Sequence, residues 1–210
     1  MPKFFFRALI LMLFIAIGQP AMSSLASDLG DGTAPIPFDV FRVGMSADEV
    51  KEAGAKELEE DVFEVEDMDW DGYKCSCMLN ITDGEVKQAI FGFDLKTALL
   101  GMLTSELSSR DLYPVSSDVL MVKNPEKIFS KSKEELENIV AERFSALADA
   151  GEGDATFYYM PADVFEGAAK AGNDEDKISD LLLKSMLYVV EVDVDEEIIA
   201  LTIGLGEDCY

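Results

Sequence analysis

The chain has 210 residues, of which 42 are acidic and 17 are lysine or arginine, so its formal net charge is −25. Such a charge repels nucleic acid and anionic lipid head groups, and we expect neither as a partner. No histidine is present, which excludes Ser-His-Asp and Cys-His catalytic relays and zinc sites built on imidazole.

Residues 1–26 have the pattern of a secretory signal peptide. Lys3 and Arg7 give a positive start, Ala8 to Gly18 form an apolar run, and Ser24-Leu25-Ala26 is a small-x-small cleavage site. The run of 11 residues is shorter than the about 20 that a membrane-spanning helix needs. We therefore expect cleavage and a periplasmic or secreted product with no stable membrane anchor. Cleavage removes two cations and no acid, which changes the net charge from −25 to −27.

The first part of the mature chain predicts a linker, a strand and a helix. Residues 27–36 are rich in Gly, Pro and Asp, which is typical of a flexible linker. Phe38 to Val43 alternates loosely as a short strand. Ser46 and Glu49 have the spacing of a capping box, in which each residue satisfies a backbone N–H of the other at a helix start.

A three-stranded meander is predicted next. Its strands are Val62–Trp70, Tyr73–Ile81 and Val86–Phe93. Asp71-Gly72 and Asp83-Gly84 join them, and Asp-Gly suits the two-residue turns of β-hairpins. The change of phase within the first strand predicts a β-bulge.

The remaining chain predicts further helices and a C-terminal hairpin. The expected elements are a helix through Leu99 to Arg110, a strand at Val119–Val122, a helix opened by a capping box of Ser132 and Glu135, a strand at Thr156–Met160, helices after Pro161 and around Ile178–Met186, and a hairpin of Leu187–Val194 and Ile198–Leu205. The expected fold class is α+β, with an antiparallel sheet and helices packed on one face. Residues 37–128 and 129–210 form two helix-plus-hairpin units that we expect to share one core.

Part of this order resembles a known family. The residues concerned are Gly44-Met45-Ser46, Glu49-Val50, Trp70, Tyr73 and Asp83-Gly84-Glu85-Val86. Over about residues 41–94 the chain resembles the BamE/SmpA outer-membrane assembly lipoproteins and the β-lactamase inhibitor protein fold, although it lacks their Gly-x-Pro after the first helix and a cysteine for lipid attachment. The resemblance implies a non-enzymatic docking module with Trp70 and Tyr73 as partner-binding residues. Packing within the hairpin or the core is the alternative role for Trp70.

Asp67, Asp69 and Asp71, followed by Gly72, match the first half of a calcium-binding loop, where alternate carboxylates converge on the ion. Met78 stands where the bidentate glutamate of such a loop is expected, so the second half is missing. A calcium site and an ordinary acidic hairpin turn are therefore the two interpretations. No other cofactor is expected.

Three cysteines raise the question of pairing in an oxidising compartment. Cys75 and Cys77 are two residues apart in one strand, which is too far for an unstrained bridge between them. We expect a disulfide between Cys77 and Cys209, with Cys75 left over. A zinc ion held by the three thiolates is the alternative.

The function expected from the sequence is non-covalent docking. Nothing supports the Ser-x-x-Lys spacing at Ser130–Lys133 as a catalytic motif, because the companion motifs of that enzyme class are missing. The acids of Val190 to Glu197 alternate with valines, which suits either a surface for a cationic partner or a solvated hairpin face. We expect an exported acidic binding or assembly module for an envelope or extracellular protein, and the acidic charge favours a basic partner. A carboxylate-dependent hydrolase and a calcium-stabilised structural protein are the alternatives.

Overall fold

A computed structural model describes residues 36–117 and 125–209. The expected signal peptide, almost all of the expected linker and the strand expected at Val119–Val122 lie outside these ranges. Within them, no helix is both long and apolar enough to cross a membrane.

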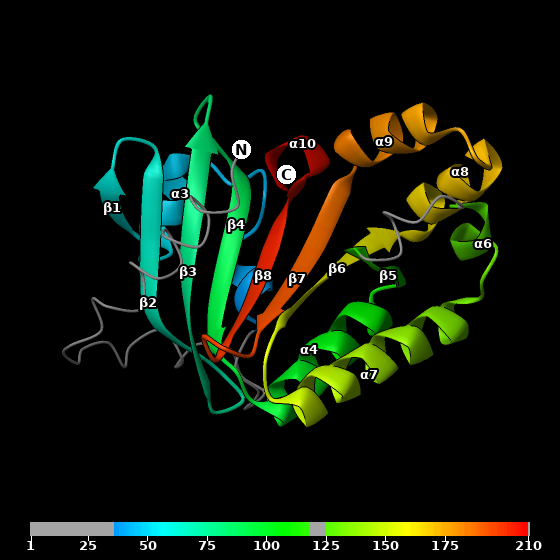
Figure 1. The fold of residues 1–210 in the computed structure, drawn as a ribbon. Helices are drawn as coiled ribbons and strands as arrows, with labels where there is room; N and C mark the ends of the chain where they lie inside the picture. Colours follow the sequence, from blue (N-terminus) through cyan, green and yellow to red (C-terminus); the bar gives the residue numbers. More distant parts are fainter. Residues whose placement is uncertain (1–35, 118–124, 210) are drawn as a thin grey trace.

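The described strands form a single antiparallel sheet in the order β1-β2-β3-β4-β8-β7-β6-β5 (Figure 1). They are β1 (Lys56–Glu59), β2 (Val62–Trp70), β3 (Tyr73–Thr82), β4 (Glu85–Asp94), β5 (Leu112–Ser116), β6 (Asp154–Pro161), β7 (Met186–Asp193) and β8 (Ile198–Leu205). The pairing of β4 with β8 joins the meander to the C-terminal hairpin. The expected α+β class with an antiparallel sheet is therefore confirmed.

The helices vary widely in length. They are α2 (Pro37–Val40), α3 (Ala47–Glu52), α4 (Thr97–Ser109), α6 (Glu126–Phe129), α7 (Lys133–Ala150), α8 (Ala162–Ala171), α9 (Glu175–Leu183) and α10 (Gly206–Cys209). Both expected capping boxes are confirmed, since Ser46 and Ser132 each accept the backbone N–H of the glutamate three residues later. These two serines set where α3 and α7 begin.

Turn chemistry builds the meander as expected. Asp71 and Gly72 have φ of 52° and 85°, and Asp83 and Gly84 have φ of 54° and 79°. A left-handed conformation at both turn residues matches the twist of the strands on either side, and Asp and Gly tolerate it better than other residues. The bulge in β2 is also confirmed, because the register with β3 shifts between Val65 and Met68.

The helices cover both faces of the sheet, so the expectation of one covered face is wrong. Along β7, Val190 and Val192 belong to one apolar cluster, while Leu187 and Val189 belong to a second. Successive side chains of a strand point to opposite faces. The first cluster includes residues of α2, α3 and α4, the second includes residues of α6, α8 and α9, and α7 contributes residues to both. The half of the sheet that contains β5, β6 and β7 is therefore apolar on both faces. A sequence that alternates apolar and polar residues indicates only one apolar face, so such a pattern does not reveal this arrangement.

One local prediction fails and two strands were missed, each for an identifiable reason. Residues 37–40 form α2 rather than a strand, because Pro37 suits a first helical turn and the three-residue spacing of Phe38 and Phe41 buries both rings. β5 was missed; it contains Pro114, which lacks an N–H and is tolerated because β5 is an edge strand. β1 consists of four exposed residues and so has no hydrophobic pattern.

Candidate functional site

The structure uses the aspartates of the calcium-like motif for the hairpin between β2 and β3. One carboxylate oxygen of Asp69 accepts the N–H of Gly72 at 2.8 Å, and the other lies 3.5 Å from the Lys74 ammonium. Asp67 sits in the bulge with φ of 55°. Among the residues that the structure describes, no group of three His, Cys, Asp or Glu side chains is arranged to hold a metal ion. The aspartates thus support the turn interpretation.

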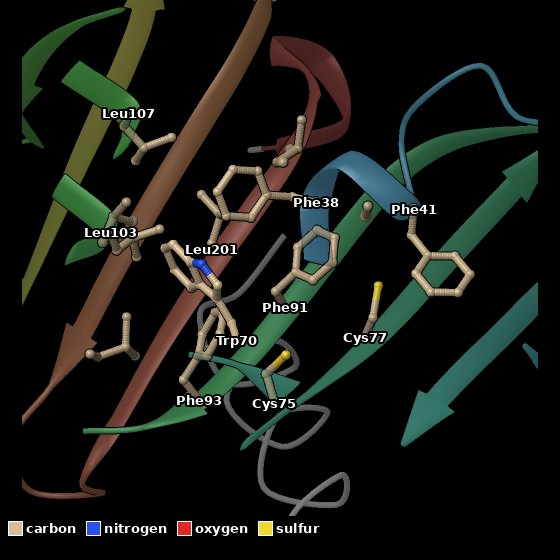
Figure 2. Packing of buried hydrophobic residues seen from close by; sticks show 14 of the residues in the cluster. Phe38, Phe41, Trp70, Cys75, Cys77, Phe91, Phe93, Leu103, Leu107 and Leu201 are labelled. Atoms are coloured by element: carbon tan, nitrogen blue, oxygen red, sulfur yellow. The ribbon is translucent and has the colours of Figure 1, made fainter. Parts of the chain in front are cut away.

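Trp70 lies in the core rather than on a free surface. Its side chain is 7% exposed and meets the ring of Phe38 edge-on, with 5.5 Å between the ring centroids. The ring of Phe93 also packs against Trp70, with 6.2 Å between the two ring centroids (Figure 2). Tyr73 is half-buried and packs against the same cluster. In the folded conformation Trp70 is a packing residue, and Tyr73 retains some exposure at the hairpin turn.

The expected disulfide between Cys77 and Cys209 is wrong, since all three cysteines are free thiols. Cys77 is fully buried in the first apolar cluster, together with Ile203 of β8. Cys209 packs against the second cluster, and its sulfur lies close over Gly204, the residue after Ile203. Because successive residues point to opposite faces, the sheet separates the two thiols. The order of elements in the sequence indicates that Cys209 approaches the sheet, but it does not indicate on which face of the sheet the side chain lies.

Burial also makes these thiols poor nucleophiles. It raises the pKa of Cys75 to about 12, with a smaller contribution from the nearby Asp69 carboxylate. It raises the pKa of Cys209 to about 12 in the same way, with Asp208 adding to the effect. The thiolate is both the reactive form of cysteine and the form that binds zinc. The raised pKa values therefore disfavour a catalytic or zinc site at these cysteines in the folded protein.

The register of four strands brings acidic residues together at one end of the sheet. Asp94 of β4 is paired with Ile198 of β8, Ile198 with Asp193 of β7, and Asp193 with Asp154 of β6. These four residues therefore form one row across the sheet. Figure 1 shows the β7–β8 turn at the same end as the end of β4 and the start of β6.

The β7–β8 turn adds three acids to this row. Asp193 accepts the N–H of Glu196 at 3.0 Å, and Asp195 accepts the N–H of Gly153 at 3.3 Å. The carbonyl of Glu197 accepts the N–H of Leu95 at 2.7 Å, which ties the turn to the end of β4. We define the acidic end of the sheet by its acidic residues, Asp94, Asp154, Asp193, Asp195, Glu196 and Glu197.

A shallow groove adjoins the acidic end. It has a volume of 520 Å³ and lies between the C-terminal part of α7 and the start of β6. Its lining residues are Arg143, Ala146, Leu147, Ala150, Glu152, Gly153, Asp154 and Asp195. The groove extends the acidic surface and gives it a partly apolar floor.

The sequence identifies only part of the acidic end. The alternation of Val190 to Glu197 indicates the carboxylates of the hairpin, and the structure confirms its two strands, with Asp193 at the end of β7 and three further acids in the turn. Asp94 and Asp154 were missed, because their place in the row depends on the β4–β8 and β6–β7 registers. An acidic residue at a strand end was the available signal, but 42 acids make that signal unspecific.

Glu64 is the acid with a raised pKa that bears on the carboxylate-hydrolase alternative. Partial burial and the neighbouring Glu66 carboxylate raise the pKa of Glu64, as an acid catalyst requires. Glu64 and Glu66 lie two apart on β2, however, and the grooves along α7 are lined by other residues.

Comparisons with known protein families, with curated proteins and with solved structures find no match to this chain.

Proposed function

We propose that the mature chain is an exported docking module that binds a basic envelope or extracellular protein through the acidic end of its sheet. The single observation that carries this proposal is the row Asp94, Ile198, Asp193 and Asp154, in which acids from three strands stand around one half-buried isoleucine. Acids at the edge of an apolar contact are a common arrangement for steering a cationic partner.

The charge of the whole molecule supports the same class of partner. With 42 acidic and 17 basic residues, the field around the protein attracts cations over about 8 Å at physiological salt. Such a field raises the association rate with a basic protein and lowers it with an acidic one. Affinity then depends on short-range contacts, for which the half-buried Ile198 and the exposed Ala146 and Ala150 of the groove are available.

A matched pair of charge variants tests this proposal. The first variant neutralises the acidic end with Asp94→Asn, Glu196→Gln and Glu197→Gln. The control neutralises three exposed acids on α7 and α9 with Glu134→Gln, Glu142→Gln and Asp176→Asn. Both variants change the net charge by the same amount. Each mature protein is immobilised and exposed to envelope extract from the source cells, and the retained proteins are quantified.

The unmodified chain should retain a basic protein from the extract. We expect the first variant to retain at least about tenfold less of it, because three charges near the contact are removed. The control should retain that protein as the unmodified chain does. Equal retention by both variants contradicts docking at the acidic end. Turnover of a peptide or cell-wall substrate by the purified chain contradicts the docking function as a whole.

A further inference from the structure

Residues 36–43, which we call the strap, cross the first apolar cluster before the sheet begins. Within the strap, the N–H of Asp39 bonds to the carbonyl of Ile36 and the N–H of Phe41 bonds to that of Pro37. Backbone pairing with the sheet is established one residue later, where Gly44 donates to the Val86 carbonyl at 2.8 Å. The strap is therefore attached to the sheet by backbone at its downstream end and by side chains along its length.

Arg110, at the end of α4, holds the strap from one side. Its two terminal nitrogens donate to the two carboxylate oxygens of Asp39, each at 2.8 Å, and its Nε donates to Glu106 at 2.8 Å. The guanidinium carbon also lies 4.7 Å from the centroid of the Phe38 ring. Arg110 thus binds the Asp39 carboxylate in a bidentate geometry and also lies over the Phe38 ring.

The strap covers an aromatic surface of the sheet. Phe38 packs edge-on against Trp70 and against Phe91, with ring centroids 5.5 and 6.0 Å apart. Figure 2 shows Phe38 on the short helix and Phe41 directly after it, with Cys77 and Phe91 of the sheet in the layer beside them. Both strap rings are buried, and the same cluster contains Cys77.

A hinge adjoins the strap on its downstream side. Gly44 has φ of +88°, a conformation that favours glycine, and nothing lies within 4 Å of the position a Cβ would take. The next residue, Met45, is already fixed, because its carbonyl accepts the N–H of Val86 at 2.8 Å. Rotation at Gly44 therefore moves the strap and breaks two backbone hydrogen bonds, from Gly44 to Val86 and from Met45 to Arg42, while the bonds from Val86 to Met45 and from Ala47 to Gly84 keep the start of α3 on the sheet.

We propose that the strap is a displaceable cover, latched by the Arg110–Asp39 pair, that opens about Gly44 while the sheet stays folded. Opening exposes Trp70, Phe91 and the thiol of Cys77, so the aromatic surface becomes available only in the open state. Segments held by few backbone hydrogen bonds open at lower free energy than the core they cover. This inference does not depend on the proposed docking at the acidic end.

The experiment measures the rate at which thiols react under native conditions. It uses the mature chain carrying Cys209→Ser, so that Cys75 and Cys77 are the two remaining thiols. An aromatic disulfide reagent is added at several urea concentrations below the unfolding transition. Each protein thiol that reacts releases a coloured aromatic thiolate, whose absorbance gives the rate. The latch variant is Asp39→Asn, and the control is Glu166→Gln, which removes the acid of an exposed ion pair with Lys170. Urea unfolding of each variant gives its global stability separately.

The strap account predicts labelling about tenfold faster in Asp39→Asn than in the parent, since a bidentate charged pair is lost. It predicts an unchanged rate in Glu166→Gln. The rates should depend less steeply on urea than global unfolding does, because opening the strap exposes only the strap and the surface beneath it. The proposal is wrong if labelling in the parent and both variants follows global unfolding with the full urea dependence.

A second variant covers the case in which the latch contributes little. Phe38→Ala removes the ring that sits on Trp70, and we expect faster labelling together with a Trp70 emission spectrum shifted to longer wavelength in the folded protein. An unchanged emission spectrum and an unchanged labelling rate at matched global stability also contradict the proposal.

Discussion

Asp154 of β6 lies directly opposite Asp193 of β7, so two acidic residues occupy one position of the sheet ladder. Like charges directly opposite each other on neighbouring strands cost a few tenths to about 1 kcal/mol. The row continues through Ile198 to Asp94, and the next turn adds Glu196 and Glu197. The folded chain thus gathers negative charge at one end of its sheet, where a cationic partner would reduce the repulsion.

Salt should stabilise this protein. Raising NaCl from about 0.05 M to about 0.5 M screens the repulsion among the acids, and we expect the free energy of unfolding to rise by roughly 1 kcal/mol. Unfolding in urea, which is uncharged, measures this at each salt concentration. The variant with Asp94→Asn, Glu196→Gln and Glu197→Gln should gain less from salt than the unmodified chain. A free energy of unfolding that falls with salt would contradict this description of the charge.

Trp70 should behave as a core residue. Its ring fills the space between Phe38 and Phe93, so Trp70→Ala leaves a cavity, and we expect a loss of about 3–5 kcal/mol in the free energy of unfolding. Trp70→Phe keeps an aromatic ring there and should cost clearly less. Denaturant unfolding of both variants gives the comparison. A loss below about 1 kcal/mol for Trp70→Ala would mean that the side chain is not packed as described.

The capping box of α7 gives a prediction with a pH dependence. Ser132→Ala should lower the free energy of unfolding by about 1 kcal/mol at neutral pH, while Ser132→Asp should largely preserve it. Hydrogen bonds from the backbone N–H of Ser132 and then from its hydroxyl hold the pKa of Glu135 below its usual 4.5. The contribution of Glu135 is therefore complete above pH 4.5 and is lost as pH falls through the lower folded pKa.

The difference between wild type and Ser132→Ala should accordingly narrow in acid. Thermal unfolding of both proteins from neutral pH down to about pH 3 measures it. A difference that widens as the pH falls would show that the Glu135 carboxylate does not take part in the box.

A count of free thiols distinguishes the three free cysteines of the structure from the disulfide that the sequence predicts. Because Cys77 and Cys209 lie on opposite faces of the sheet, the purified, unreduced protein should show three free thiols after unfolding in denaturant. In the folded protein, the raised pKa values of Cys75 and Cys209 should keep both thiols unreactive at about pH 8. A count of one thiol in the unfolded, unreduced protein would establish a disulfide and contradict this arrangement.

Local signals predicted the parts of the fold that depend on a few neighbouring residues. The Asp-Gly turns define the meander, and Ser46 and Ser132 mark two helix starts, because each signal satisfies backbone geometry or hydrogen bonding within four residues. The C-terminal hairpin followed from its alternating valines in the same way.

What the sequence could not predict depends on contacts between distant segments. Asp94 and Asp154 join the acidic end only through pairing with β8 and β7, and the face occupied by Cys209 depends on how α10 folds back over Gly204. The strap formed a helical turn because burial of Phe38 and Phe41 outweighed a loosely alternating pattern. Tertiary packing decided each of these, and no local pattern records it.

If a basic protein binds at the acidic end of the sheet, as we propose, its dissociation constant should depend strongly on salt. The basic protein retained from envelope extract is purified and titrated against the mature chain at about 0.05 M and about 0.3 M NaCl. The account predicts at least about tenfold weaker binding at the higher salt, and a clearly smaller salt effect with Asp94→Asn, Glu196→Gln and Glu197→Gln than with the control set on α7 and α9. A dissociation constant that does not change with salt, and that is the same for both variants, would contradict the claim.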